Sequence, residues 1–388
     1  MATVVQERHV ERLIDSCYAD LDLAGLTDEV MRRLPGILPV EAAFFAAVDP
    51  ATLLFTSVTT QEPLAGAAEL FLDNEFGRAD VNKFAALAHG PEPVMTLDRA
   101  TRGQRSASAR YREIMAGLGL GDELRAALVA GQECWGVLCL HRADADAGFS
   151  GTDLAVLRKV APHLAEGLRR TVVHRTLIAE GPGTAGAPGI VVLDQDLTPV
   201  SISPDAERWL ARLPGPDVAG LPMAVHAVAA RLARPDDTPP DAEPPTGSVR
   251  IRTADGQWLA LHATQLRGRA GAQIGVVVEP APAAEVGSLL LAAHGLTPAQ
   301  SRVTALVLQG CSTRDIVGRL HVSAYTVQEH LTAVFSRFGV SSRRELIAAV
   351  LSPRTATGPG TEVSPSAPRS RRTLPPGSAA SGEPPSTT

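Results

Sequence analysis

A run of short amphipathic segments near the C-terminus decides how the chain is organised. Residues 296–351 read LTPAQSRVTALVLQGCSTRDIVGRLHVSAYTVQEHLTAVFSRFGVSSRRELIAAVL. Helix-start signals recur in this stretch, because a Ser or Thr is repeatedly followed three residues later by a polar side chain that can complete the cap. The signals begin at Thr297, Ser312, Ser323 and Ser342. The stretch therefore predicts four short helices, with Gly310 and Gly339 placed as left-handed C-terminal caps.

The second and third of these helices are joined by only two residues. We place them at roughly Ser312–Leu320 and Ser323–Phe338, with His321-Val322 between them. A connection this short imposes a tight angle, which is the helix-turn-helix arrangement whose second helix enters a major groove. Apolar side chains recur at helical spacing on that second helix, at Val327, Leu331, Val334 and Phe338. This face is predicted to be buried.

The same residues resemble the LuxR-type DNA-binding domain of bacterial transcription regulators. The matching positions are Leu296-Thr297, Gly310, Ile316, Leu320, Val322-Ser323, Thr326-Val327, His330, Gly339-Val340 and Arg343. The sequence departs from the family pattern in two places: Ala299-Gln300 stands in place of Arg-Glu, and Thr304 in place of Leu. The resemblance implies an all-α four-helix domain over residues 289–352 that binds double-stranded DNA as a homodimer. We expect its first helix to be held by a capping box and packing rather than by an ion pair.

Side chains outside the apolar face of the second helix are the candidate contacts to DNA. Gln328, Glu329 and Thr332 are placed to reach base edges, where Gln can pair with adenine and Glu can accept from cytosine. The other predicted contacts, most of them to phosphates, are Arg314, Arg319, Ser323, Tyr325, Thr326, Arg337 and Arg343. Gln328→Ala is predicted to relax sequence preference, and Arg337→Ala to weaken all sites alike and flatten the salt dependence. His330 is predicted to be half-buried.

Length and charge agree with a DNA reader joined to a sensing part. A chain of 388 residues with 45% apolar content should hold two or three domains. The net charge is −6, while residues 296–351 hold six arginines and three acids, which gives +3 there and −9 elsewhere. The sequence shows no signal peptide and no apolar run of about 20 residues, which predicts a cytoplasmic protein without membrane contact. Scarce lysine and abundant Ala, Arg, Gly and Pro fit a GC-rich bacterial genome.

Residues 1–178 read as one α/β domain. Two hairpins are predicted, around Asp49-Pro50 and Gly131-Gln132. A short strand is predicted at 93–97, and helices at 9–18, 27–34, 65–74, 80–89, 107–118 and 153–178, the last kinked at Pro162. This order, with Cys134-Trp135-Gly136-Val137-Leu138 and later Phe149-Ser150 before the last helix, resembles a GAF domain. The resemblance implies an effector, either a small molecule or a protein, held between the sheet and residues 60–120. Candidate lining residues are Arg78, Asp80, Tyr111 and Trp135.

Residues 189–283 form the middle region, after a Gly/Pro/Ala linker at 179–188. The segment Gly189–Asp194, a turn at Asp196-Leu197 and the helix-like Ser203–Leu210 resemble the start of a PAS domain. Three further strands are predicted at 248–252, 257–265 and 273–279, with a loop at 234–246. The resemblance implies a short α+β domain for dimerisation or signal relay. Residues 353–388 are rich in Pro, Ser, Thr, Gly and Arg and are predicted to be a disordered tail.

The fold class is therefore multidomain. Among the possible functions, the motifs exclude catalysis. There is no nucleophile elbow, no phosphate loop and no lysine placed for a phosphoacceptor pocket. The four cysteines, Cys17, Cys134, Cys139 and Cys311, lack metal-ligand spacing and are expected to be reduced. We predict no enzyme activity, no catalytic residue, no metal and no cofactor. The alternative to a DNA-binding regulator is a protein-interaction or signal-relay module without sequence-specific DNA binding.

Overall fold

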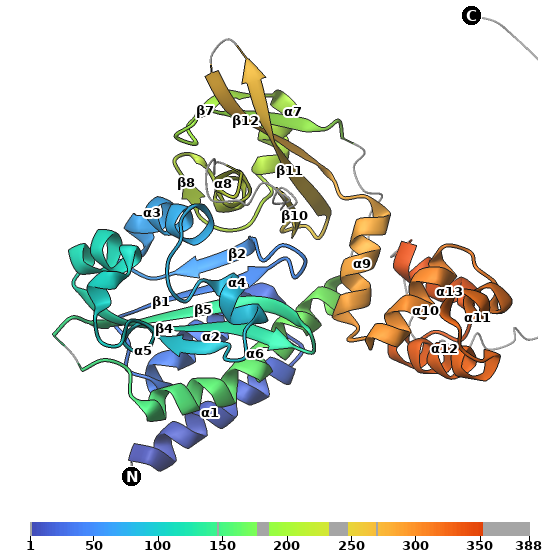
Figure 1. The fold of residues 1–388 in the computed structure, drawn as a ribbon, viewed down its shortest axis with the longest axis horizontal. Coiled ribbons are helices and arrows are strands. Elements are labelled where there is room, and N and C mark those ends of the chain that lie inside the picture. The colour runs from blue at the N-terminus through green and yellow to red at the C-terminus, as the bar shows by residue number, and fades with distance from the viewer. Residues whose placement is uncertain (1, 146, 177–185, 233–246, 269–270, 352–388) are drawn as a thin grey trace, which may run out of the picture. The chain divides into compact units, whose positions relative to one another are not determined.

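The computed structural model of the chain describes residues 2–145, 147–176, 186–232, 247–268 and 271–351. The N-terminal part is built on an antiparallel five-stranded sheet with the order β2-β1-β5-β4-β3 (Figure 1). Its strands are β1 (Ala42–Val48), β2 (Phe55–Thr60), β3 (Val94–Thr96), β4 (Leu120–Ala130) and β5 (Glu133–Ala143). β1 pairs with β2 and β4 with β5, so both predicted hairpins and the short predicted strand are confirmed.

Long helices pack on one face of this sheet. They are α1 (Ala2–Tyr18), α2 (Leu23–Ile37) and α6 (Gly151–Thr176). Side chains of β5 alternate between the faces, so that Leu138 and Leu140 join the core under these helices while Cys139 lies on the other side. α1 and α2 confirm the predicted helices and extend beyond them. α6 confirms the helix predicted from Asp153 and continues through Pro162.

The opposite face of the sheet is covered by short helical segments, where the sequence predicts longer helices. They are η1 (Ala65–Ala67), α3 (Ala68–Leu72), η2 (Asp73–Gly77), α4 (Phe84–His89), α5 (Leu97–Thr101), η3 (Arg105–Ala107), η4 (Tyr111–Met115) and η5 (Ala116–Leu118). The helix predicted over 80–89 is wrong in its first half, because Asn82 takes a left-handed conformation with φ of 55° before α4 begins. The helix predicted over 107–118 is interrupted at Ser108, whose backbone is extended.

A second antiparallel sheet occupies the middle of the chain, in the order β10-β11-β12-β6-β7. Its strands are β6 (Gly189–Leu193), β7 (Pro199–Ile202), β10 (Ser248–Arg252), β11 (Trp258–Gly268) and β12 (Gly271–Pro280). The predicted strands of this sheet are confirmed, and so is the helix after Ser203, which becomes α7 (Pro204–Leu210). A two-stranded ribbon, β8 (Asp217–Val218) with β9 (Leu221–Pro222), follows α7.

Helix α8 (Met223–Ala230) is an element that the sequence analysis does not predict. All eight of its residues are buried, and all but His226 are apolar, so the helix has no single apolar stripe. Its Met223 and Val225 share one hydrophobic core with Phe44 and Phe71 of the N-terminal part. The cavity between Phe44, Phe71 and Met223 has a volume of only about 10 Å³. This cavity, which lies in the region where the GAF resemblance places an effector, is therefore nearly filled.

Five helices complete the described chain. They are α9 (Ala283–Ala293), α10 (Pro298–Leu308), α11 (Thr313–Leu320), α12 (Ala324–Phe338) and α13 (Arg343–Leu351). The last four are the helices predicted from the sequence, and α9 is additional. Their core is formed by Val303, Val307, Ile316, Val327, Leu331, Val334, Leu346 and Val350. α9 packs against α6 and also against α13, so it touches both the N-terminal part and the four-helix module.

Several predictions fall on residues that the structure does not describe. These are most of the linker at 179–188, the loop at 234–246 and the tail at 353–388. Within the described ranges, no helix has the length and apolar character needed to cross a membrane. The domain limits proposed from the sequence stay predictions.

Candidate nucleic-acid interface

The three residues between α11 and α12 set the angle of the helix-turn-helix. His321 ends α11 in a left-handed conformation, with φ of 53° and ψ of 42°. Ser323 then opens α12, because its Oγ accepts from the backbone N–H of Thr326 at 3.0 Å. Ser312 opens α11 in the same way, and the Asp315 carboxylate reaches back to Ser312 N at 2.9 Å. Both predicted caps are confirmed, and they satisfy N–H groups that a helix leaves unpaired.

The first helix of the module accommodates its departures from the family pattern within itself. Thr297 N donates to Gln300 Oε1 at 3.0 Å, and Gln300 N donates to Thr297 Oγ1 at 3.3 Å, so the predicted capping box is confirmed. Thr304 is fully buried, and its hydroxyl donates to the Gln300 carbonyl at 2.8 Å. A Thr in a core position is tolerated here because its polar atom has a partner.

The remaining helix-end signals are confirmed with one difference. Gly310 and Gly339 have φ of 80° and 62°, which is the left-handed region predicted for them. Ser342 Oγ accepts from Glu345 N at 3.2 Å, as expected of a cap. The Glu345 carboxylate, however, accepts from Ser341 N at 2.7 Å and not from Ser342 N, so the box closes one residue earlier than predicted.

α12 has two opposed faces. Its buried face consists of Val327, Leu331 and Val334. The predicted base-contacting residues Gln328, Glu329 and Thr332 are all exposed, and Tyr325 is 73% exposed. Positions four apart lie on the same side of a helix, so Gln328 and Thr332 are neighbours, and the Thr332 hydroxyl donates to the Gln328 carbonyl at 2.9 Å. His330 is half-buried, as predicted.

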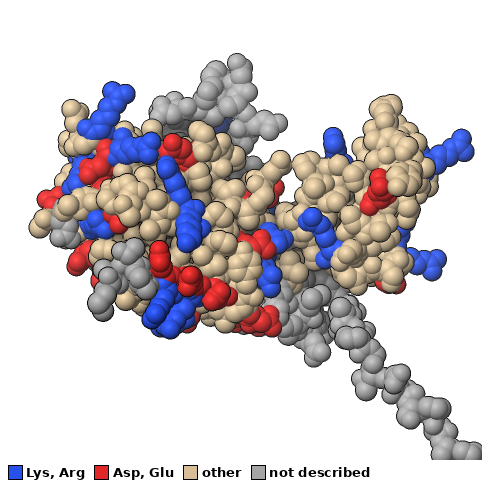
Figure 2. Space-filling model, turned by 90° about the horizontal axis from the view of Figure 1, so that it is seen from below, with Lys and Arg blue, Asp and Glu red and all other residues tan. Residues whose placement is uncertain are grey.

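Two arginines of the preceding helix α11 are exposed to solvent. Arg314 and Arg319 are exposed, and Figure 2 shows basic side chains standing singly on the surface of the helical module. Arg343 was predicted as a DNA contact, but its guanidinium donates to the Cys311 carbonyl at 3.0 Å and to Thr313 Oγ1 at 3.1 Å. In the structure Arg343 fixes the start of α13 to the start of α11.

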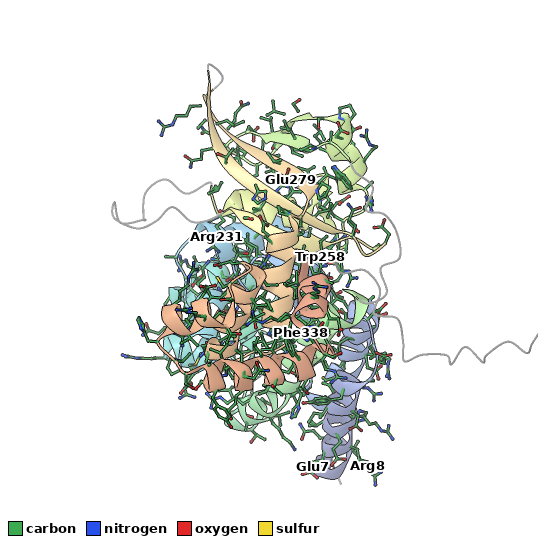
Figure 3. The ribbon with its side chains drawn as sticks, turned by 90° about the vertical axis from the view of Figure 1, so that its right-hand side faces the viewer. Glu7, Arg8, Arg231, Trp258, Glu279 and Phe338 are labelled. Carbon is green, nitrogen blue, oxygen red and sulfur yellow. The ribbon has the colours of Figure 1, made fainter. Side chains whose placement is uncertain are left out.

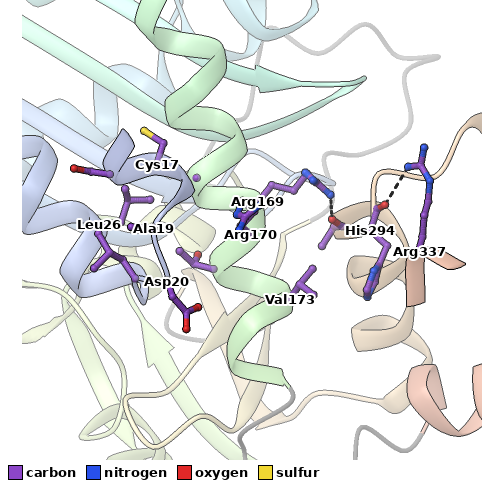
Figure 4. Close-up of a pocket in the computed structure, with 14 residues that line it drawn as sticks. Cys17, Ala19, Asp20, Leu26, Arg169, Arg170, Val173, His294 and Arg337 are labelled. Atoms are coloured by element: carbon purple, nitrogen blue, oxygen red, sulfur yellow. Dashed lines mark hydrogen bonds between the residues drawn. The ribbon is translucent and has the colours of Figure 1, made fainter. Parts of the chain in front are cut away.

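Arg337 likewise has partners inside the protein (Figure 4). Its guanidinium donates to the carbonyl oxygens of His294 and Gly295, between α9 and α10. The His294 ring stacks on Phe338, which Figure 3 labels, at a centroid distance of 3.7 Å. Burial lowers the pKa of His294 to about 4, so the ring is neutral at pH 7. From the other side, Arg169 of α6 donates to the last carbonyl of α9.

A buried charged network lies in the N-terminal sheet. Glu123, Cys139 and His141 bring their ligand-type atoms within 4.8 Å of one another, the one such group among the residues described. Two guanidinium groups already hold Glu123, with Arg110 Nη2 at 2.6 Å and Arg125 Nε at 3.0 Å. Burial raises the pKa of the Cys139 thiol well above its usual value. The arrangement is a closed ion network, in which a divalent cation would face two fixed positive charges.

The four residues proposed to line an effector pocket are not brought together. Arg78 pairs with Glu113 at the surface, and Asp80 is buried where it accepts from the backbone N–H of Arg110 at 2.7 Å. Trp135 packs on the opposite, helix-covered face of the sheet. The prediction of one pocket shared by these side chains is therefore wrong.

Comparison with known proteins identifies two parts of the chain. Residues 294–350 match the family model described as bacterial regulatory proteins, luxR family. Residues 22–168 match the GAF domain model. The chain carries a luxR-family domain and a GAF domain. The resemblances drawn from the C-terminal helices and from the first 178 residues are thus confirmed.

Relatives of the luxR-family domain bear the names of HTH-type transcriptional regulators. Those of Mycobacterium bovis and Mycobacterium tuberculosis (strain H37Rv) are each 48% identical to this chain over 52 residues. The alignment covers 13% of this chain and 6% of each relative. The chain therefore matches only a small part of the length of these relatives.

Solved structures also resemble parts of the chain. A GAF domain of A. aeolicus nlh2 in an inactive state covers 44% of this chain and 99% of its own length, at 16% identity and a TM-score of 0.31. PelD from Pseudomonas aeruginosa PAO1 covers 73% of this chain and 80% of its own length, at 14% identity and a TM-score of 0.28.

Proposed function

We propose that the protein regulates transcription by binding double-stranded DNA as a homodimer through α11 and α12 of its luxR-family domain. The observation that carries this proposal is the two-faced helix α12. Its apolar face is buried in the module, and Gln328, Glu329 and Thr332 are exposed on its other face. These are side chains that can read base edges in a major groove. The half-sites of a dimer would then lie about one helical turn of DNA apart.

The remaining contacts are proposed for the rim of this face. Arg314 and Arg319 neutralise phosphates, and Tyr325 lies exposed near the start of α12. The hydroxyls of Ser323 and Thr326, 2.9 Å apart at that N-terminus, sit where helix N–H groups favour a phosphate. Arg337 and Arg343 act first as internal supports that hold the helices in position.

Gating by the N-terminal part is proposed to pass through α9. Arg169 of α6 holds the last carbonyl of α9, and Arg337 of α12 holds the next two carbonyls along the chain. A shift of α6 would therefore displace the C-terminal end of α12. The GAF domain would supply that shift when a small molecule or a protein binds it.

Binding of the purified protein to the region upstream of its own gene tests this proposal. We expect a saturable change in fluorescence anisotropy on that duplex, resistant to non-specific competitor DNA, and a dimer in sedimentation velocity. The second candidate function is a protein-interaction module without sequence-specific DNA binding. Binding that is equal on all duplexes, or no binding at low salt, would favour this second function.

Gln328→Ala is expected to relax sequence preference without unfolding the domain. One good base contact gives about 1–3 kcal/mol of discrimination, so the ratio of affinities for the preferred and the altered site should fall by about fivefold to 150-fold. Gln309→Ala is the matched control, because Gln309 is an exposed Gln at the end of α10. If both variants keep the ratio of the unchanged protein, Gln328 is not a base-reading residue.

Arg314→Ala is expected to weaken binding to every sequence alike. A lost phosphate contact should reduce the slope of log K against log salt concentration by about 0.9. Arg314 is a cleaner test than Arg337, because replacing Arg337 also removes its bonds to the α9–α10 connection. Arg302→Ala, on the exposed side of α10, is the control and should keep the slope. An unchanged slope for Arg314→Ala would remove this residue from the interface.

A further inference from the structure

A cavity of about 260 Å³ lies where the GAF domain, the middle sheet and α9 meet. It is distinct from the nearly filled space beside Phe71, because it opens on the helix-covered side of the sheet. Most of its wall is apolar, including Leu23, Val48, Leu168, Pro214 and Leu289. An apolar cavity of about 150 Å³ is enough for benzene. The volume here suits a molecule of one substituted aromatic ring.

Two indole rings bring unpaired hydrogen-bond donors to this cavity. Trp135 and Trp258 both line it, and the Nε1–H of each is buried without a hydrogen-bond acceptor among the described residues. Trp135 is only 2% exposed. The third tryptophan, Trp209, lies elsewhere and donates to the Ala187 carbonyl at 3.0 Å. Buried donors are nearly always paired, so two unpaired donors in one cavity indicate a missing acceptor.

The charged residues around the cavity are already paired. Asp49 and Arg250 form a buried ion pair with a contact of 2.5 Å. Asp22 accepts from Gly25 N at 2.8 Å as the cap of α2, and Arg252 donates to the Gly256 carbonyl at 3.1 Å. An ionic ligand would therefore have to compete with the partners that these charged groups already have. The acceptor that the indoles lack is best supplied by a neutral group.

We infer that this cavity is a binding site for a neutral, mainly apolar small molecule whose carbonyl-type oxygen accepts from the buried indole N–H groups of Trp135 and Trp258. Because α6 and α9 form part of the cavity wall, a bound ligand could shift these helices and so affect the luxR-family domain. Binding of the ligand to this cavity does not depend on the proposed function. An effect of the ligand on DNA binding does rest on the proposed function.

Acetophenone and ethylbenzene test the binding, because they have nearly the same shape and differ in the carbonyl oxygen. Both are titrated into the full chain and followed by ligand-observed proton NMR. One buried hydrogen bond predicts that acetophenone binds about twofold to tenfold more tightly. Trp135→Phe and Trp258→Phe should each reduce this preference, whereas Trp209→Phe should keep it. The preference is a ratio, so a change in cavity size that affects both ligands does not disturb it.

Three results would overturn the inference. They are no binding of acetophenone at millimolar concentration, equal affinity of the two ligands for the unchanged protein, and a preference that survives in both Trp135→Phe and Trp258→Phe. The first two comparisons need no variant, so the test holds even where a variant fails to fold. DNA anisotropy with and without acetophenone is measured separately. Loss of DNA binding in both conditions, with acetophenone still bound, would count against the proposed function and leave the site standing.

Discussion

Replacing Glu123 by Ala is expected to lower the free energy of unfolding of the GAF domain by about 3–5 kcal/mol, because it strands buried positive charge. Glu123 is fully buried and accepts from Arg110 Nη2 at 2.6 Å and from Arg125 Nε at 3.0 Å. Arg110 and Arg125 are 1% and 0% exposed. Arg125 retains the acidic partner Glu75 at 2.7 Å, but the one acidic partner that Arg110 keeps is the more distant Asp80 at 3.7 Å. Urea unfolding followed by tryptophan fluorescence measures the change.

The exposed pair of Glu113 with Arg78 is the matched control. The contact is short, at 2.5 Å, but both side chains are more than two-fifths exposed. Solvent screens such a pair, so Glu113→Ala should cost no more than about 1 kcal/mol. If Glu123→Ala costs no more than Glu113→Ala, the buried network contributes nothing to stability.

Acid sensitivity gives the same network a second readout. Burial alone would raise the pKa of Glu123, but Arg110 and Arg125 outweigh it and hold the pKa well below 4.5. The stability contributed by this lowered pKa is therefore fully present above about pH 4.5 and is lost as the pH falls towards the folded-state pKa. Glu123→Ala should lack that part of the acid dependence.

The features that the sequence predicted correctly are local ones. A cap at Ser312 or Ser323 and a left-handed glycine at Gly339 depend on a few neighbouring residues, and the buried face of α12 depends on spacing within one helix. The buried pairs depend on distant segments: Glu123 with Arg110 spans 13 positions and Asp49 with Arg250 spans 201. Such pairing follows from tertiary packing, so no local pattern announces it.

In the candidate DNA interface too, the local features were predictable from the sequence and the contacts between distant segments were not. Exposure of Gln328 and Thr332 follows from helix periodicity and was predictable. The roles of Arg337 and Arg343 were not, because a long side chain can reach carbonyls or hydroxyls far back in the chain, 42 and 32 positions away in these cases. Alternate charges at Glu123 and Arg125 within an apolar strand were a visible signal of the buried network. α8 gave no periodic signal, since it is buried on every side.

Asp49→Ala is expected to destabilise the junction of the GAF domain, the middle sheet and α9, again by about 3–5 kcal/mol. The Asp49 carboxylate accepts from Arg250 N at 2.9 Å and from Arg250 Nε at 2.8 Å. Arg250 in turn donates to the Glu285 carbonyl at 2.8 Å and to Ser288 Oγ at 2.9 Å in α9. Without Asp49 the guanidinium is a buried charge with only neutral partners. The unfolding midpoint should therefore fall, and α9 should be held less firmly.

The double variant Asp49→Ala/Arg250→Met separates the lost charge pair from the lost packing. Removing both charges takes away the unpaired guanidinium and leaves an apolar side chain of similar length, so the double variant should be more stable than Asp49→Ala. Asp255→Ala is the control, because its partner pair with Arg212 is largely exposed on the Asp side and should contribute less than about 1 kcal/mol. A double variant as unstable as the sum of its single changes would show that Asp49 and Arg250 act independently. Hydrogen exchange of the α9 amides adds the link to function: faster exchange in Asp49→Ala than in Asp255→Ala is expected if this ion pair, through Glu285 and Ser288, keeps α9 seated between α6 and the luxR-family domain.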